Sequence, residues 1–472
     1  MYIPTIGIEM HCEMKSFSKV FSKARNTYSE EANIHVAVND IALPGILPTL
    51  NKEVLRKSIM VASILNCEIP EYFFFDRKNY YYPDLPKGYQ ITQTHSPIGV
   101  NGHITIPYQE EELDVLIHDI HLEEDTAQLE HIKDSTYINY NRAGVPLLEL
   151  VTGPCFHTKD EVVSFIEYIR RVYQYADISD ADVTKGQIRC DVNISLSDSD
   201  NLGTRVEVKN VNSISNVAAV IDYEIKRQLD LLESGRGEKI EQESRRWDEE
   251  SCTTKRMRSK EDAIDYRYFV EPNIPKIKID PQYVLEIKKS IPVLPLERLR
   301  TYLNEYGLTR VDANTLLKEK AISDYFNQCV TLGIEPKIAM NWITVTIMGF
   351  LNKEGKNISN ISLLPEDLKY VIDKIKDGSI SSKQAKEAVL ASLEQNKKPQ
   401  EFMKEENTQI SDEAKLTEII ESILEKNTSQ VEAYHSGKTN LFQFFVGQVM
   451  KETKGLANPV KTREILEKKL QS

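Results

Sequence analysis

Acidic, basic and histidine side chains recur at alternate positions in several short segments of the sequence. In the first of these segments, Glu9, His11 and Glu13 alternate with apolar residues. Later segments with the same pattern contribute His118, His121, Glu123, Glu124, Asp125, Arg189, Asp191, Arg205, Glu207 and Lys209. Carboxylate and imidazole groups that converge from several strands can bind a hard cation such as Mg²⁺ or Mn²⁺. Basic groups among them could hold the phosphate oxygens of a substrate bound to that metal.

The same pattern also has a purely structural interpretation. A strand with one polar face is commonly the wet side of a sheet, where opposite charges on neighbouring strands form ion pairs. A single segment of this kind would favour that interpretation. Because four segments share the pattern, the metal site and the wet sheet surface remain open as alternatives.

The alternation predicts the elements that would position these side chains. Apolar residues at every second position predict strands around residues 6–13, 188–194 and 204–208. The last two should be neighbours, because only the polar turn SDSDNLG joins them. Amphipathic helices are predicted over residues 160–176 and 215–234. The first part of the chain is therefore expected to be an α+β domain with a large, mainly antiparallel sheet.

Two prolines, Pro292 and Pro295, mark the end of this part of the chain. The pattern beyond them is helical, with a capping-box spacing that starts at Ser381. The polar segment 396–410 is typical of a linker. We therefore predict three domains, namely a cradle domain over 1–290, an all-helical middle domain over 291–405 and a helical tail domain over 406–472.

Charge distinguishes the tail from the rest of the molecule. The 472 residues carry 59 Lys and Arg against 72 Asp and Glu, a net charge of −13, which argues against a protein whose whole surface binds nucleic acid. Residues 436–472 contain seven Lys or Arg and three Glu, which leaves +4. This surplus indicates either a solvated helical face or a contact with nucleic acid.

Several classes of protein are disfavoured by what the sequence lacks. No apolar run approaches the roughly 18 residues of a membrane span, and the N-terminal segment is unlike a signal peptide. Six cysteines without a C-x-x-C pair favour a reducing compartment. There is no G-x-x-x-x-G-K-[ST] loop and no G-x-S-x-G nucleophile. We expect a soluble cytoplasmic protein.

Dense polar and aromatic blocks identify a family. The sequence resembles the B subunits of tRNA-dependent amidotransferases, which act on aspartyl- or glutamyl-tRNA(Asn/Gln). The resemblance rests on blocks in family order along nearly the whole chain: IGIEMHCEM, LPGILPTLNK, FDRKNYYYPDLPKGYQIT, HLEEDTAQ, NRAGVPLLEL, RCDVNISL, GTRVEVKNVNS, RRWDEE, MRSKEDAIDYRYF and FFVGQVMKETKGLANP.

The resemblance implies an ATP-dependent carbon–nitrogen ligase that uses glutamine as amido donor. The B member of such a complex binds misacylated Glu-tRNA(Gln) or Asp-tRNA(Asn) and phosphorylates the side-chain carboxylate with ATP and Mg²⁺. Ammonia from an amidase A subunit then gives Gln-tRNA(Gln) or Asn-tRNA(Asn), and a small C subunit completes the heterotrimer. The absence of an amidase motif from this chain agrees with such a division of labour.

Residue roles follow from the resemblance and the strand pattern together. The expected direct or water-mediated metal ligands are Glu9, His11, Glu124 and Asp191, with Glu123 and Glu207 nearby. The expected contacts to phosphate or carboxylate are Lys78, Arg189 and Lys209. The expected tRNA contacts are Lys438, Lys451, Lys454 and Lys461.

One departure from the family pattern concerns zinc. Many relatives carry a C-x-C pair and a later C-x-x-C pair where this chain has Ser22, Ala24, Ala37 and Asp40. These residues cannot supply the thiolates of such a site, so no structural zinc is expected.

Two other functions compete with the ligase. One is a docking module that still binds tRNA and the amidase partner but has lost phosphoryl transfer. The other is a metal-dependent phosphodiesterase or nuclease, which would act without ATP.

Overall fold

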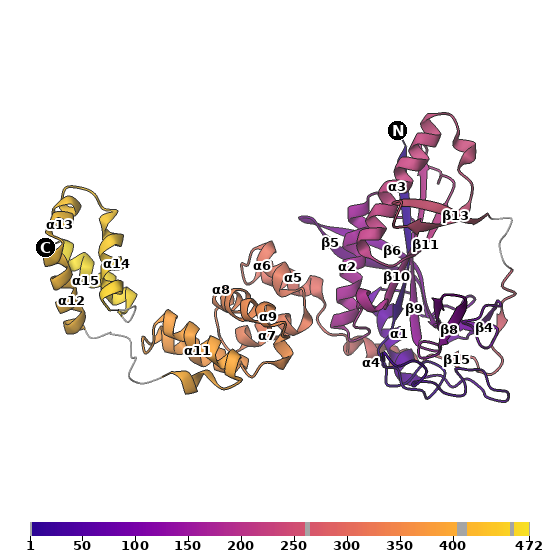
Figure 1. Ribbon diagram of the computed structural model, residues 1–472, viewed down its shortest axis with the longest axis horizontal. Helices are drawn as coiled ribbons and strands as arrows, with labels where there is room; N and C mark the ends of the chain where they lie inside the picture. Colours follow the sequence, from indigo (N-terminus) through magenta and orange to yellow (C-terminus); the bar gives the residue numbers. More distant parts are fainter. Residues whose placement is uncertain (1, 260–264, 404–412, 454–456, 472) are drawn as a thin grey trace. The chain divides into compact units, whose positions relative to one another are not determined.

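The computed structural model describes residues 2–259, 265–403, 413–453 and 457–471. The chain divides into two compact units, residues 1–297 and 298–472 (Figure 1). The strands described lie in the first unit, whereas the second is helical. The predicted α+β class is therefore confirmed, and the finer division into three domains stays a prediction.

An eight-stranded sheet is the centre of the first unit. Its neighbouring strands are antiparallel except for the parallel pair β11–β12. The strands, in order across the sheet, are β13 (Thr253–Ser259), β12 (Glu243–Asp248), β11 (Val206–Val211), β10 (Ile188–Ser197), β1 (Ile3–Glu13), β9 (Pro146–Thr152), β6 (Glu111–Glu124) and β5 (Gly99–Tyr108). The three predicted strands are confirmed, as is the antiparallel pairing of β10 with β11.

Strand β1 lies in the middle of the sheet and has two different faces. Ile8, Met10 and Cys12 are at most 1% exposed. Glu9 and His11 point to the opposite face, because successive side chains alternate along a strand. The register places His11 beside a residue of β10 on one side and a residue of β9 on the other. Polar side chains of three adjacent strands therefore meet on one face.

Helices cover the apolar face of the sheet. Helices α2 (Lys159–Tyr175) and α3 (Ile214–Glu233) pack against each other, and α3 also packs against β10 (Figure 1). The predicted helices over residues 160–176 and 215–234 are confirmed to within one residue at each end. The hydroxyl of Thr158 caps α2, and that of Ser213 caps α3, so both begin where their sequences predict.

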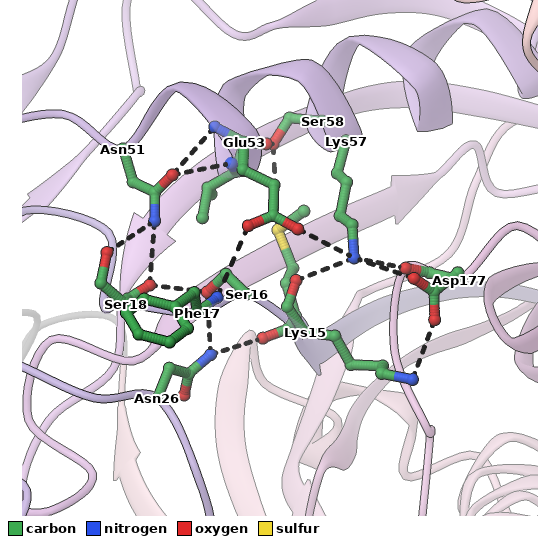
Figure 2. Close-up of polar contacts among 12 residues, drawn as sticks. Lys15, Ser16, Phe17, Ser18, Asn26, Asn51, Glu53, Lys57, Ser58 and Asp177 are labelled. Atoms are coloured by element: carbon green, nitrogen blue, oxygen red, sulfur yellow. Dashed lines mark hydrogen bonds and ion pairs between the residues drawn. The ribbon is translucent and has the colours of Figure 1, made fainter.

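A polar network fastens the chain that leaves β1 to helix α1 (Lys52–Ile64), as Figure 2 shows. The buried ammonium of Lys57 donates to the carbonyl oxygens of Asp177 at 2.6 Å and Lys15 at 3.0 Å. The side chain of Asn51 caps α1 and also donates to the carbonyl of Ser18 at 3.0 Å. These contacts fix the end of β1 against the helix and so fix the direction in which its opposite, polar face points.

The described part of the first unit also contains three smaller sheets. One consists of β3 (Asp76–Asn79), β4 (Tyr89–Thr92) and β14 (Phe269–Val270), and β3 carries Lys78. The other two are the pairs β2 (Tyr72–Phe73) with β15 (Ile277–Lys278), and β7 (Gln128–Ile132) with β8 (Ser135–Asn139). Helix α4 (Pro281–Lys289) packs against α1.

The second unit begins within helix α5 (Pro295–Asn304). Its longer elements are α6 (Arg310–Leu316), α7 (Lys320–Thr331), α8 (Pro336–Asn341), a π-helical segment (Trp342–Ile347), α9 (Met348–Glu354), α10 (Pro365–Lys376), α11 (Ser382–Gln395), α12 (Glu413–Lys426), α13 (Thr428–His435), α14 (Leu441–Glu452) and α15 (Pro459–Gln471). The predicted capping box at Ser381 is confirmed. Residues 404–410 of the predicted linker lie outside the described residues.

The last four helices enclose a core made from their own side chains. Its buried members include Leu416, Ile420, Phe445, Val449 and Leu466. Over the ranges that the structure describes, no helix is both long and apolar enough to cross a bilayer.

Candidate metal and phosphate site

Among the residues that the structure describes, two groups of potential metal ligands stand on the polar face of the large sheet. The first comprises His11, Glu123 and Glu149, and the second comprises Glu9, Asp191 and Glu207. Within each group, one ligand atom per residue lies within 4.8 Å of the others. Both groups use β1, on which Glu9 and His11 are two positions apart and hence about 7 Å apart.

The first group is organised around the carboxylate of Glu149. Its Oε2 lies 3.2 Å from Nε2 of His11 and 3.0 Å from Nε2 of His121. The other ring nitrogen of His121 lies 2.9 Å from Asp119, while Glu123 is 4.0 Å from His11. One imidazole and two carboxylates suit a divalent cation, and His121 is placed to orient one of them.

The first group holds opposite charges close together in a desolvated place. Burial alone would lower the pKa of His11, but the neighbouring carboxylate of Glu149 raises it to about 9. Burial and the charge of Glu149 raise the pKa of Glu123. Burial would also raise the pKa of Glu149, yet His121 and His11 hold it well below its usual range. At neutral pH the protonated His11 therefore balances part of this negative charge, and a divalent cation bound here would take the place of its proton.

The second group already contains a cation from the protein. The ammonium of Lys209 lies 3.0 Å from Asp191 and 2.6 Å from Glu207. Burial would lower the pKa of Lys209, but these two carboxylates raise it. The side chain of Asn193 donates to Glu9 at 2.9 Å. The second group thus combines carboxylates, which can bind a metal, with an ammonium and an amide, which can contact phosphate oxygens. It could therefore bind a metal ion and a phosphate group side by side.

The structure brings together five of the six predicted metal ligands but not Glu124. The carboxylate of Glu124 pairs with Lys87 and accepts from the backbone N–H of Ile91 at 2.9 Å. Adjacent residues of a strand point to opposite faces, so Glu123 and Glu124 cannot belong to the same group. Glu124 instead lines a separate cavity, of about 220 Å³, which also contains Asp40.

The other predicted contacts have different surroundings. Lys209 stands in the second group, as described, whereas Arg189 donates to Asp125 at 2.7 Å. The ammonium of Lys78 lies 5.0 Å from the centre of the Tyr266 ring. Burial would lower the pKa of Lys78, but the nearby charge of Glu123 raises it. Lys78 therefore faces the first group and is placed to meet an anion there.

Glu149 and Arg246 were not singled out from the sequence, and His121 was named in the polar pattern but given no specific role. Glu149 and His121 complete the first group, and Arg246 on β12 is the parallel-strand partner of Lys209. Arg246 is exposed, and within the described part of the chain it has no side-chain hydrogen bond or ion pair. The available signals were a lone carboxylate within PLLELVT and the pair of arginines that opens RRWDEE.

At the positions without zinc-binding cysteines, the side chains have other contacts. Asp40 is buried and accepts from the ammonium of Lys19, also buried, at 3.0 Å. Ser22 is buried as well, and its hydroxyl accepts from the N–H of Ala24 at 3.3 Å.

The predicted tRNA contacts lie on different elements of the tail. Lys451 is on α14, Lys461 is on α15, and Lys438 precedes α14. All three are exposed. Lys454 lies outside the described residues.

Two protein families match the chain. The family described as the GatB/GatE catalytic domain matches residues 4–285, and the family described as the GatB domain matches residues 324–470. The B subunit of the aspartyl/glutamyl-tRNA(Asn/Gln) amidotransferase of Geobacillus thermodenitrificans is 42% identical over 465 residues, 98% of this chain and 97% of that protein. Proteins of the same name from Persephonella marina and Wolbachia pipientis are each 41% identical, over 99% and 98% of both chains. The two ligand groups lie within the first matched region.

Proposed function

Since the chain belongs to the family described as the GatB/GatE catalytic domain, we propose that it is the activating subunit of a glutamine-dependent tRNA amidotransferase. In this proposal it binds Glu-tRNA(Gln), Asp-tRNA(Asn) or both, and transfers the γ-phosphoryl group of ATP to the side-chain carboxylate. Ammonia then displaces phosphate to form the amide. The reaction is that of an ATP-dependent carbon–nitrogen ligase.

The observation that carries this proposal is the presence of two carboxylate-rich groups, with lysines beside them, on one sheet face. A carboxylate is a poor acceptor for ammonia because oxide is a very poor leaving group, whereas phosphate leaves readily. Activation requires two anions, the carboxylate and the γ-phosphate, to approach each other. The site must therefore supply positive charge and fix an in-line geometry.

The protein contributes ligands and cations to this task. His11, Glu123 and Glu149 would hold one Mg²⁺ ion, and Glu9, Asp191 and Glu207 are placed to hold another. When bound, such an ion offsets phosphate charge. Lys78 and Lys209 stand beside the two groups and would contact the phosphoryl group or the carboxylate.

Arg246 adds a further cation on β12, the strand next to the one that carries Lys209. It is the register partner of Lys209, and neighbouring strands are about 5 Å apart. Lys209 is already paired with two carboxylates, whereas Arg246 is available to bind phosphate. A planar guanidinium can contact two phosphate oxygens at once.

The printed names of the relatives, which describe B subunits of an amidotransferase, support a complex with other subunits. We place this chain in a heterotrimer with an amidase A subunit, which supplies ammonia, and a small C subunit. The tail lysines would contact the tRNA, and the complex would act in the cytoplasm.

An activation assay tests the proposal. The chain is co-expressed with its two partner subunits and incubated with Glu-tRNA(Gln), Mg²⁺ and γ-labelled ATP in the absence of glutamine. We expect label in an alkali-labile acyl phosphate, which His11→Ala and Asp191→Ala should abolish without dissociating the complex. Loss of the whole complex in these variants would assign the two residues a structural role.

Two other outcomes would overturn the proposal. Tight tRNA binding without transfer of label would identify a docking module. Cleavage of the RNA without ATP would identify a nuclease. Repeating the assay with Asp-tRNA(Asn) decides which tRNA is the substrate.

A further inference from the structure

Another cavity lies in the helical unit, and none of the residues used above lines it. Its volume is about 370 Å³. It is formed by α8, the π-helical segment, the end of α10 and the start of α11, and α11 packs against the π-helical segment. The lining residues are Ile338, Asn341, Trp342, Val345, Thr346, Ile372, Ile375, Lys376, Ser382 and Lys386.

The charge of this cavity has one sign. Lys376 and Lys386 are the charged residues of the lining, and no carboxylate accompanies them. Neither lysine has an ion pair or side-chain hydrogen bond within the described ranges, whereas Lys369 and Lys374, also on α10, pair with Asp373 and Asp377. Two uncompensated ammonium groups at one opening attract an anion.

The wall of the cavity is aromatic and aliphatic. The indole of Trp342 is half-buried, and Ile338, Ile372 and Ile375 surround the same space. Trp342 begins a π-helical segment, which is a rare conformation that is frequent at functional sites. Such a wall suits a flat apolar group that stacks on the indole.

The start of α11 adds polar groups to the same opening. The hydroxyl of Ser381 and the amide of Gln384 cap the helix, and Ser382 and Lys386 then face the cavity from its first two turns. The amino end of a helix carries partial positive charge, which reinforces the two lysines.

We propose that this cavity binds a nucleotide, either free or as one unit of an RNA chain. The base would stack on Trp342, and the phosphate would lie between Lys376 and Lys386. Asn341 and Thr346 offer hydrogen bonds to the base or the sugar. The volume falls within the range of ligand pockets, and stacking of a base on an aromatic side chain is a large contribution to binding.

Tryptophan fluorescence of the full chain tests this proposal. The chain has two tryptophans, so Trp247→Phe leaves Trp342 as the reporter. Titration with AMP in EDTA keeps any metal-dependent nucleotide binding in the first unit silent. We expect saturable quenching, and a dissociation constant that rises about tenfold or more in Lys376→Ala/Lys386→Ala, because each charge-assisted contact is strong.

The matched control is Lys383→Ala, which removes an exposed lysine from the first turn of α11 that does not line the cavity. It should change the dissociation constant less than about twofold. A parallel titration with an RNA oligonucleotide distinguishes a site for a free nucleotide from a site for one unit of an RNA chain. An RNA site should bind the oligonucleotide more tightly than AMP.

Absence of saturable quenching by both AMP and RNA would overturn the proposal. So would quenching that Lys376→Ala/Lys386→Ala leaves unchanged, because the ligand would then bind elsewhere. Neither result bears on ATP-dependent activation, which uses residues of the other unit and requires metal.

Discussion

The carboxylate of Glu149 holds the first ligand group together, because it contacts both His11 and His121. His121 is placed to orient Glu149, and the other nitrogen of its ring contacts Asp119. Outer contacts of this kind commonly matter almost as much as the ligands themselves. Glu149, a single position of β9, is thus linked to His11, to His121 and, through His121, to the carboxylate of Asp119.

Glu149→Gln should reduce ATP-dependent activation by about 100-fold, because removal of a ligand charge weakens metal binding. The measurement is acyl-phosphate formation by the complex, together with calorimetric titration of Mn²⁺. The matched control is Glu130→Gln, an exposed carboxylate of β7 that belongs to neither group. Full activity with unchanged Mn²⁺ affinity would remove Glu149 from the site.

Arg246→Ala should raise the KM for ATP or for the acyl-tRNA by about tenfold, because one charge-assisted contact to phosphate is lost. The substrate whose KM changes identifies the phosphate that Arg246 binds. The side chain is exposed, so the fold should be unaffected, and unfolding in urea checks this. Unchanged values of both KM constants would show that Arg246 contacts neither substrate.

Only some of the residues of this site could be predicted from the sequence. The alternation around Glu9, His11 and Asp191 fixed which side chains share a face, since that depends only on the period of a strand. The place of Glu149 in the site could not be predicted, because its strand is mostly apolar. A single charged residue in such a strand does not by itself indicate a site. Its role depends on which strands become neighbours, and pairing between strands far apart in the chain is a property of the whole fold.

At the scale of elements, α1 anchors the strand that carries both groups. Contacts of Lys57 and Asn51 hold the segment after β1 (Figure 2). Strands and helices were predictable here because their periodicity and caps are local. The parallel pairing of β11 with β12 could not be predicted, because the local sequence RRWDEE does not specify the direction of the strand beside it.

Lys57→Met should lower the free energy of unfolding of the first unit by about 2–4 kcal/mol, because two backbone carbonyls lose a charged donor in a buried place. Urea unfolding measures the effect. Lys52→Met, which replaces an exposed lysine of the same helix, should change it by less than about 0.5 kcal/mol. Equal effects of both variants would show that the network does not anchor β1.

The Asp177 carboxyl makes the same region sensitive to acid. Burial would raise its pKa, but Lys15 and Lys57 hold it below its usual range. Its folded pKa is thus lower than its unfolded pKa of about 3.9, so its stabilisation is present above that pH and is lost as the pH falls through the folded value.

Asp177→Asn should therefore cost up to about 1 kcal/mol at pH 7, a value limited by solvent screening. The difference between parent and variant should shrink as the pH falls below about 4. Urea unfolding at several pH values measures this difference. A difference that stays constant with pH would exclude the ion pairs as its origin.

At the scale of the whole molecule, the last four helices have their own core. Their removal should therefore expose little apolar surface elsewhere. The basic surplus of residues 436–472 belongs to this part. A module with its own core can change the affinity for a large substrate without disturbing the chemistry of the first unit.

Deletion of residues 411–472 should weaken tRNA binding by about tenfold or more, since several phosphate contacts are lost together. The glutaminase activity of the amidase partner should not change. Filter binding at two salt concentrations measures the loss and its electrostatic share. Unchanged affinity for tRNA would show that the tail does not contact it.

The central place of β1 has a consequence for how the protein is made. Its partner strands β9 and β10 begin only at Pro146 and Ile188, far later in the chain. A ribosome adds roughly 5–20 residues per second, so the nascent β1 remains unpaired for roughly ten to thirty seconds. During that time its apolar face is open to chaperones. The first ligand group can close once β9 has emerged, and the second must wait for β11.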